Sequence, residues 1–173
     1  MADIVFARIT ARNAAELETM IHKFTEYELD PPTNPDFYNH PITALGWQTE
    51  RWFQICSETV GGFWANELGK NQVRINAVYS GTPSTTWSTA QNTSTVLNYF
   101  GPNGLGYIPA TPAELGGWTG GTAAQVVNAI NDGAFMLQHR DHGSTTGWGE
   151  PDFGISNLSS LTNDDLTFVF SIS

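Results

Sequence analysis

Segments with the pattern of β-strands alternate with segments with the pattern of α-helices along most of the 173-residue chain. The strand-like segments are short and apolar, and they cover residues 4–10, 42–49, 73–79, 134–139 and 166–173. The helix-like segments repeat apolar residues every three or four positions, and they cover residues 13–29, 58–68 and 122–131, with a shorter turn or helix near 155–161. This order predicts an α/β fold with a mostly parallel sheet and helices on both faces.

Local signals indicate where two of these helices begin and end. Asn13 is followed three residues later by Glu16, a variant of the capping box, so the first helix is expected to begin there. Ser57 is expected to cap the helix over 58–68, and Gly69 is expected to end it.

The length of the chain favours a single domain over residues 1–173. Residues 30–42 are predicted to form a loop. A longer loop at about 82–121 is rich in Gly, Thr, Asn and Trp. A connection of that length is usually functional or carries short helices of its own.

The formal net charge of −10, with only seven Lys and Arg residues, disfavours nucleic acid and anionic membrane surfaces as partners. Cys56 is the single cysteine, so the chain has no internal disulfide. The sequence has no stretch of about 18 apolar residues that would span a membrane. It begins within a strand-like segment and shows no signal peptide, which favours a piece of a longer precursor.

Two histidines follow the strand over 134–139 at the point where it ends. Active sites of parallel sheets gather beyond the carboxyl ends of the strands, so His139 or His142 is a candidate general base. The amide of Gly143 would be accessible to an oxyanion. A structural histidine in a polar turn is an equally good interpretation. The spacing of His139 and His142, with Asp141 nearby, could suggest a metal site, but on a turn it does not place both rings on one face, so no metal is expected there.

The run from His142 to Gly149 is followed by Phe153, by residues 161–163 (Leu-Thr-Asn) and by the apolar strand over 166–172. This block resembles the gingipain family of cysteine peptidases. A weaker similarity extends upstream to residues 3–8 and 44–46 and leaves out the long loop. The resemblance implies a caspase-like three-layer α/β fold, here incomplete.

The resemblance also implies roles for five residues. His142 matches the catalytic histidine and Gly143 the glycine of the oxyanion hole. Glu50 lies about where the family has a glutamate that assists the histidine. Glu58 approximates the acidic residue of the specificity pocket, and Trp148 is expected to contact the substrate.

In this family the nucleophilic cysteine is delivered at the carboxyl end of the strand that matches 166–173. We therefore expect the cysteine to follow Ser173, and we expect the chain alone to be inactive. Ser171 and Ser173 are weak substitutes because a hydroxyl is much less acidic than a thiol. Cys56 lies at a helix start, but it belongs to a different element.

The resemblance implies a secreted bacterial enzyme, outside the cell or on its surface, with a protein or peptide substrate. The only cofactor that it implies is calcium, bound in acidic loops. Asp164 and Asp165 are a weak sign of such a loop. An incomplete sheet would expose an apolar edge and favour self-association.

Two alternatives stay open. The first is a pseudo-peptidase that has lost its nucleophile. The second is a non-catalytic module that binds carbohydrate or protein through loop tryptophans, namely Trp87, Trp118 and Trp148.

Overall fold

The protein is described by a computed structural model that covers residues 8–83, 85–115 and 120–173. Contacts divide the chain into two compact units, Met1–Thr33 and Asn34–Ser173, which we call unit 1 and unit 2. That both belong to one peptidase domain stays a prediction.

Unit 1 contains one helix, α1 (Ala14–Leu29), which confirms the predicted helix. The side chain of Asn13 caps it by accepting a hydrogen bond of 3.0 Å from the Glu16 amide. The Glu16 carboxylate reaches back to the amide of Arg12, at 2.9 Å, rather than to that of Asn13. Of the strand predicted over 4–10, residues 8–10 have no regular secondary structure, and the rest lies outside the described residues.

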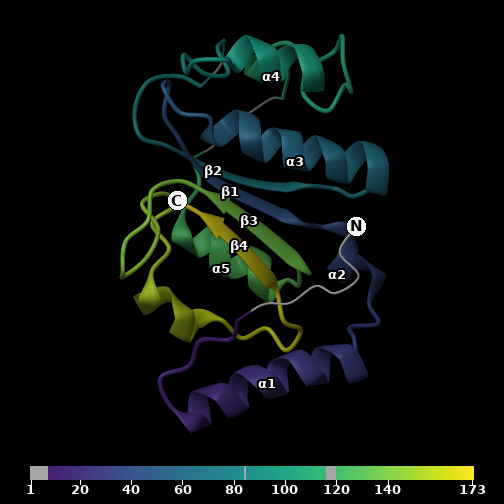
Figure 1. Cartoon of the computed structure of the whole chain (residues 1–173), viewed down its shortest axis with the longest axis vertical. Helices are drawn as coiled ribbons and strands as arrows, with labels where there is room; N and C mark the ends of the chain where they lie inside the picture. The colour runs from purple at the N-terminus through teal and green to yellow at the C-terminus, as the bar shows by residue number, and fades with distance from the viewer. Residues whose placement is uncertain (1–7, 84, 116–119) are drawn as a thin grey trace. The chain divides into compact units, whose positions relative to one another are not determined.

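Unit 2 is built on a four-stranded parallel sheet with the strand order β2-β1-β3-β4 (Figure 1). The strands are β1 (Ile42–Trp47), β2 (Val73–Val78), β3 (Met136–Arg140) and β4 (Phe168–Ile172). All four were predicted, with ends that differ by one or two residues. The α/β class and the parallel sheet are therefore confirmed.

Helices cover both faces of this sheet. Figure 1 shows α3 on one face, α5 on the other, and α4 beyond α3. The helices of unit 2 are α2 (Pro35–Asn39), α3 (Phe53–Leu68), α4 (Thr93–Phe100) and α5 (Ala123–Asn131), with short 3₁₀ helices at Pro112–Leu115 and Ile155–Ser160. This arrangement is consistent with the three layers of a caspase-like fold.

Three predictions about the helices need correction or completion. Helix α3 begins at Phe53, five residues earlier than predicted, and Ser57 does not cap it. Ser57 is buried inside the helix, where its hydroxyl donates a 2.9 Å hydrogen bond to Gln138. Helix α2 lies within the predicted loop over 30–42. Gly69 ends α3 in the left-handed conformation, as predicted.

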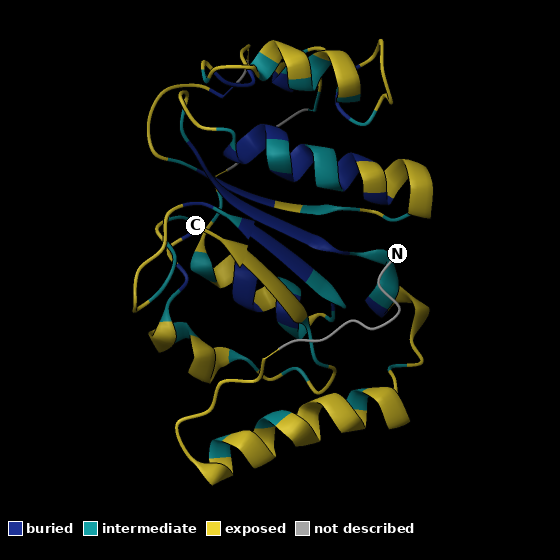
Figure 2. Ribbon diagram, viewed as in Figure 1, coloured by how far each residue is buried: buried dark blue, intermediate teal, exposed yellow. Residues whose placement is uncertain are grey.

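The core of unit 2 lies between the sheet and its helices. Strand β1 is buried along its whole length, whereas every residue of β4 is exposed (Figure 2). Apolar side chains of β1, β2 and β3 pack against α5 through Val126, Val127 and Ile130. Ile55 of α3 forms a second cluster with Trp87 and Ile108 of the long loop. The long loop is therefore anchored by apolar packing.

The strand order places a topological switch point between β1 and β3. From β1 the chain passes through α3 to β2 on one side, while β3 pairs with the other side of β1. The connections that leave two such strands diverge, which opens a crevice outside their carboxyl ends. Gln48 follows β1 and Asp141 follows β3 at this point.

Candidate active site

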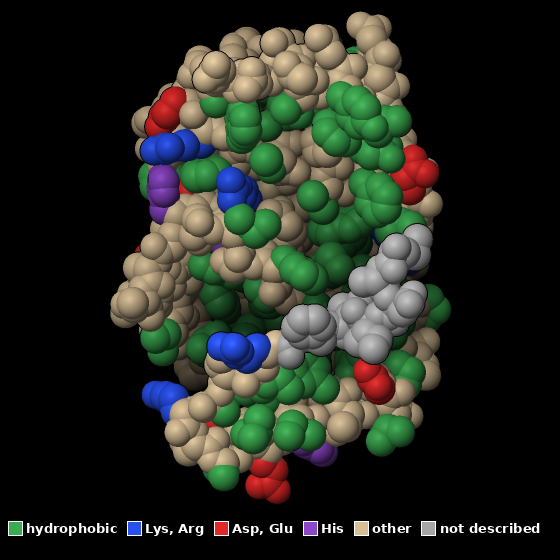
Figure 3. All heavy atoms as spheres, in the orientation of Figure 1, with side chains coloured by type: hydrophobic (Ala, Val, Ile, Leu, Met, Phe, Trp, Pro, Cys, Tyr) green, Lys and Arg blue, Asp and Glu red, His purple; other side chains and the backbone are tan. Residues whose placement is uncertain are grey.

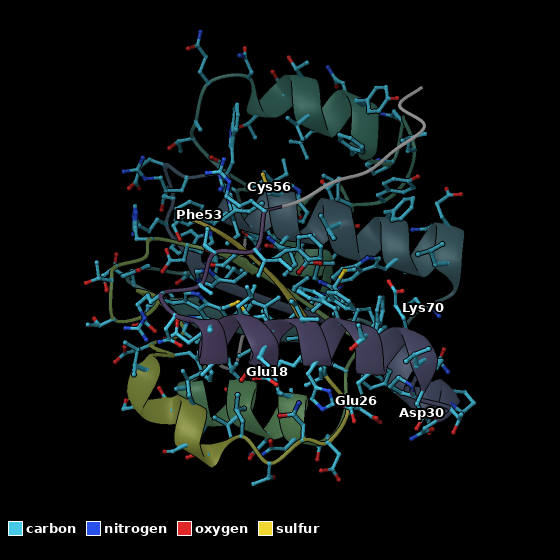
Figure 4. The ribbon with its side chains drawn as sticks, turned by 60° about the horizontal axis from the view of Figure 1, so that its bottom comes forward. Glu18, Glu26, Asp30, Phe53, Cys56 and Lys70 are labelled. Atoms are coloured by element: carbon cyan, nitrogen blue, oxygen red, sulfur yellow. The ribbon has the colours of Figure 1, made fainter. Side chains whose placement is uncertain are left out.

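His142 lies at the switch point, two residues beyond the end of β3, and its side chain is exposed. Its ring meets Phe53 edge to face, with centroids 5.3 Å apart, and Tyr79 at 6.4 Å. Its Nε2 atom is 3.5 Å from Oε1 of Gln48. Phe53 is in the first turn of α3, at the same end as Cys56 (Figure 4). The imidazole thus stands in solvent between aromatic side chains.

Asp141 directly precedes His142 in the chain and is fully buried. Its Oδ2 atom accepts hydrogen bonds from the Tyr79 hydroxyl, at 2.5 Å, and from the Glu150 amide, at 2.6 Å. Burial raises the pKa of Tyr79, and the bond to Asp141 raises it further. The phenol therefore keeps its proton and remains a donor at neutral pH.

Gly143 follows His142 in a short loop closed by two backbone bonds. The Gly149 amide donates to the His142 carbonyl at 2.7 Å, and the Ser144 amide donates to that of Gly147 at 2.8 Å. Among the hydrogen bonds of the described residues, none uses the Gly143 amide. A Cβ atom on Gly143 would lie 2.7 Å from the Ser173 hydroxyl. The carboxyl end of β4 therefore reaches Gly143.

Glu50 lies in the exposed turn after β1, with Oε1 3.8 Å from Nε of Arg51. Among the hydrogen bonds and ion pairs of the described residues, none joins its carboxylate to His142, whose ring lies next to Gln48. The role of Glu50 stays a prediction. Sequence reasoning missed Gln48 and Tyr79, although each stands at the end of a predicted strand.

The two residues predicted to bind substrate have partners inside the molecule. Glu58 is buried in α3, and both of its carboxylate oxygens lie 2.9 Å from Nε of Arg74 on β2. Trp148 stacks on His139 with the ring centroids 4.0 Å apart and the planes 5° apart. It also packs against Phe153. These contacts give both residues a structural role, and their contact with substrate stays a prediction.

His139 is the buried histidine of the pair. Its Nδ1 atom is 2.9 Å from the Ser171 hydroxyl, and burial lowers its pKa to about 4. It is therefore neutral at physiological pH and a weak base. Across the described part of the chain there is no cluster of three or more metal-ligating side chains.

The remaining candidates from the sequence are partly or fully buried, or lie outside the described residues. Cys56 is partly buried, and burial raises the pKa of its thiol. The Trp87 ring is only 2% exposed, which leaves no face for stacking on a sugar. Trp118 lies outside the described residues. None of the described helices is long and apolar enough to cross a membrane.

Fold and site together define an α/β protein with a histidine and a polar cluster at the switch point of a parallel sheet. The model of peptidase family C25 matches residues 1–173, the whole chain. The chain therefore belongs to peptidase family C25 and is a domain related to cysteine peptidases.

Three relatives are similar over a limited part of the chain. Gingipain R2 of Porphyromonas gingivalis is 35% identical over 54 residues, which are 31% of this chain and 7% of that protein. Two forms of gingipain R1 from the same species have the same identity over the same length, covering 5% and 3% of those proteins. The matched segment is thus a small part of each relative. No solved structure matches the chain.

Proposed function

We propose that this chain forms part of the catalytic domain of a secreted cysteine endopeptidase in which His142 is the general base. The proposal rests on one observation. His142 stands at the switch point beside Gly143, and the carboxyl end of β4 reaches the same glycine. A thiol delivered just beyond β4 would lie near both the imidazole and a free backbone amide.

The proposed reaction begins when the imidazole of His142 takes the proton of that thiol. The thiolate sulfur attacks the carbonyl carbon of the peptide, and the amides of Gly143 and of the cysteine itself hold the oxyanion. The C–N bond then breaks as the imidazolium gives its proton to the leaving amine. Water hydrolyses the thioester, which releases the acid product and restores the thiol.

Further parts of the proposal rest on the family resemblance. Glu50 would orient the imidazole, Glu58 would line the specificity pocket and Trp148 would contact the peptide. The enzyme would act outside the bacterial cell or on its surface, and calcium would bind to an acidic loop such as that of Asp164 and Asp165.

The test is peptide hydrolysis by the full polypeptide that the gene encodes, compared with its His142→Ala variant. We expect the substitution to lower kcat/KM by about a thousandfold or more, because it removes the general base. His22→Ala is the matched control, since this imidazole is exposed on α1 and should be dispensable. Hydrolysis that survives His142→Ala would overturn the proposal.

The 173-residue chain on its own is proposed to be inactive, because it carries the histidine and its one cysteine, Cys56, lies in α3. The measurement is hydrolysis of a peptide library by the purified chain. Turnover that requires Cys56 would show that this thiol is the nucleophile and would contradict the assignment.

We also propose that the chain associates with a second copy of itself through β4. Figure 3 is viewed as Figure 1, where β4 lies in front, and it shows hydrophobic side chains at the surface there. Val169, Phe170 and Ile172 are each about half exposed, and no charged residue interrupts the strand. Uncharged edge strands readily pair with other strands.

Sedimentation equilibrium tests the association. The wild type is expected to show a concentration-dependent rise in mass that Val169→Lys abolishes. Leu158→Lys is the matched control, because Leu158 is equally exposed but lies in the 3₁₀ helix at Ile155–Ser160. A wild type that stays monomeric at the highest soluble concentration would refute the proposal.

A further inference from the structure

We propose that Tyr79 and Asp141 form a clamp that positions His142 for catalysis. The inference rests on the proposed function, because it takes His142 as the general base. It goes further by assigning two positioning residues to that base. The clamp joins the end of β2, which is distant in sequence, to both ends of the loop that follows β3.

One carboxylate oxygen holds these segments together. Oδ2 of Asp141 accepts the Tyr79 hydroxyl at 2.5 Å and the Glu150 amide at 2.6 Å, and the side chain of Asp141 is fully buried. Hydrogen bonds to a charged acceptor are about twice as strong as neutral ones, and they strengthen away from water. The clamp therefore fixes both ends of the loop over residues 142–149.

His142 is attached directly to this clamp. It follows Asp141 in the chain, and its carbonyl accepts the amide of Gly149, the residue before Glu150, at 2.7 Å. Its backbone is thus held from both sides. The centroid of the Tyr79 ring also lies 6.4 Å from that of the imidazole, which contacts Phe53 as well. The same tyrosine therefore anchors the backbone of His142 and borders its ring.

Two glycines make room for the clamp. A Cβ atom on Gly46 of β1 would lie 2.5 Å from the carboxyl carbon of Asp141. A Cβ atom on Gly149 would lie 2.5 Å from the Tyr79 hydroxyl. Both distances are far below a van der Waals contact, so any side chain at either position would push the clamp apart. The geometry of the clamp therefore requires glycine at both positions.

Asp141 acts through the backbone and not on the imidazole itself. Its Oδ2 atom is engaged by Tyr79 and Glu150, and the polar neighbour of the His142 ring is Gln48. This distinguishes it from an aspartate that binds the catalytic histidine directly. Tyr79 and Asp141 are therefore positioning residues.

NMR of the 173-residue chain tests the clamp directly. The wild type is expected to show nuclear Overhauser effects between the imidazole protons of His142 and the Phe53 ring. Tyr79→Phe should weaken them at least about twofold, because it removes one bond of the clamp without emptying the ring site. Tyr99→Phe is the matched control, since this tyrosine is 62% exposed on α4 and should change nothing.

Substitutions of Asp141 separate positioning from general stability. Asp141→Asn keeps an acceptor for Tyr79 and Glu150 and should retain the contacts of the His142 ring. Asp141→Ala removes the acceptor, and the Glu150 amide should then exchange its hydrogen at least about tenfold faster. If Asp141→Ala does not fold, the comparison of Tyr79→Phe with Asp141→Asn still shows whether the clamp positions the His142 ring. Unchanged His142 contacts in Tyr79→Phe would overturn the clamp.

Peptide hydrolysis by the full gene product separates failure of the clamp from failure of the proposed function. We expect Tyr79→Phe to lower kcat by about 10- to 100-fold, because small displacements of a catalytic group cost that much, with KM changed by less than about twofold. A kcat that falls with His142→Ala but not with Tyr79→Phe would refute only the clamp. A kcat that withstands His142→Ala would refute the proposed function.

Discussion

His139 and His142 are three residues apart at the end of β3, yet they lie in opposite environments. His139 is buried on the strand, stacked on Trp148 and bonded to Ser171. His142 is exposed beyond the strand, next to Gln48. The difference shows that the end of the strand separates a buried imidazole from one exposed to solvent. The histidine within the sheet contributes to packing, and the one past the end of the strand is the one that we propose as the general base.

The largest expected difference between the two histidines is in stability. His139→Ala should lower the free energy of unfolding by about 2–4 kcal/mol, because it empties a buried ring site and unstacks Trp148. His142→Ala should change it by less than about 0.5 kcal/mol, as is usual for an exposed side chain. Urea denaturation of the two variants measures both changes in the free energy of unfolding. Equal losses would remove the contrast between a structural and a functional histidine.

The second prediction concerns pH. Burial lowers the pKa of His139 to about 4, from 6.5 in the unfolded chain. Between these values the unfolded state binds more protons, so this contribution to stability is complete above pH 6.5 and is lost as the pH falls toward 4. The loss should amount to about 3 kcal/mol. Urea denaturation of wild type and His139→Phe at both ends of this range should show a flatter profile for the variant.

A smaller effect should come from the partner of His139. Ser171→Ala removes the hydroxyl that lies 2.9 Å from Nδ1 and leaves a buried ring nitrogen without a partner. The expected loss is about 1 kcal/mol, measured by urea denaturation. Ser159→Ala is the control, because this exposed serine is in the 3₁₀ helix at Ile155–Ser160. No difference between the two variants would show that the bond adds nothing to the burial of His139.

The smallest expected effect concerns the polar residue that orients the imidazole of His142. At 3.5 Å the contact with Gln48 is weak, so Gln48→Ala should lower kcat of the full gene product only about two- to fivefold. Glu50→Gln tests the competing assignment from the family resemblance. The variant with the larger fall in kcat identifies the residue that orients the imidazole, and a fall only in Glu50→Gln would rule out Gln48.

Much of the framework could be predicted because its signals are local. The helix after Asn13 and the end of α3 at Gly69 follow from caps that need only neighbouring residues. The start of α3 could not be predicted in this way, since Trp52 makes no side-chain cap bond. Ser57 looked like a cap, but it bonds to Gln138 on β3, far along the chain.

The site was only partly predictable for the same reason. His142 and Gly143 were indicated by their place after a strand and by the family resemblance. Tyr79 and Gln48 reach His142 only after the strands pair in the order β2-β1-β3-β4. Which of several polar residues at strand ends converge depends on that order, and a single sequence does not fix it.

We propose above that His142 activates a thiol delivered at the end of β4. This proposal is tested most directly by the pH dependence of iodoacetamide alkylation of the first cysteine after Ser173 in the full gene product, with and without His142→Ala. We predict an alkylation midpoint well below the ordinary thiol pKa of about 8.5, which moves back toward that value in the variant. The same midpoint in both proteins, or no cysteine in that position, would show that His142 does not activate such a thiol.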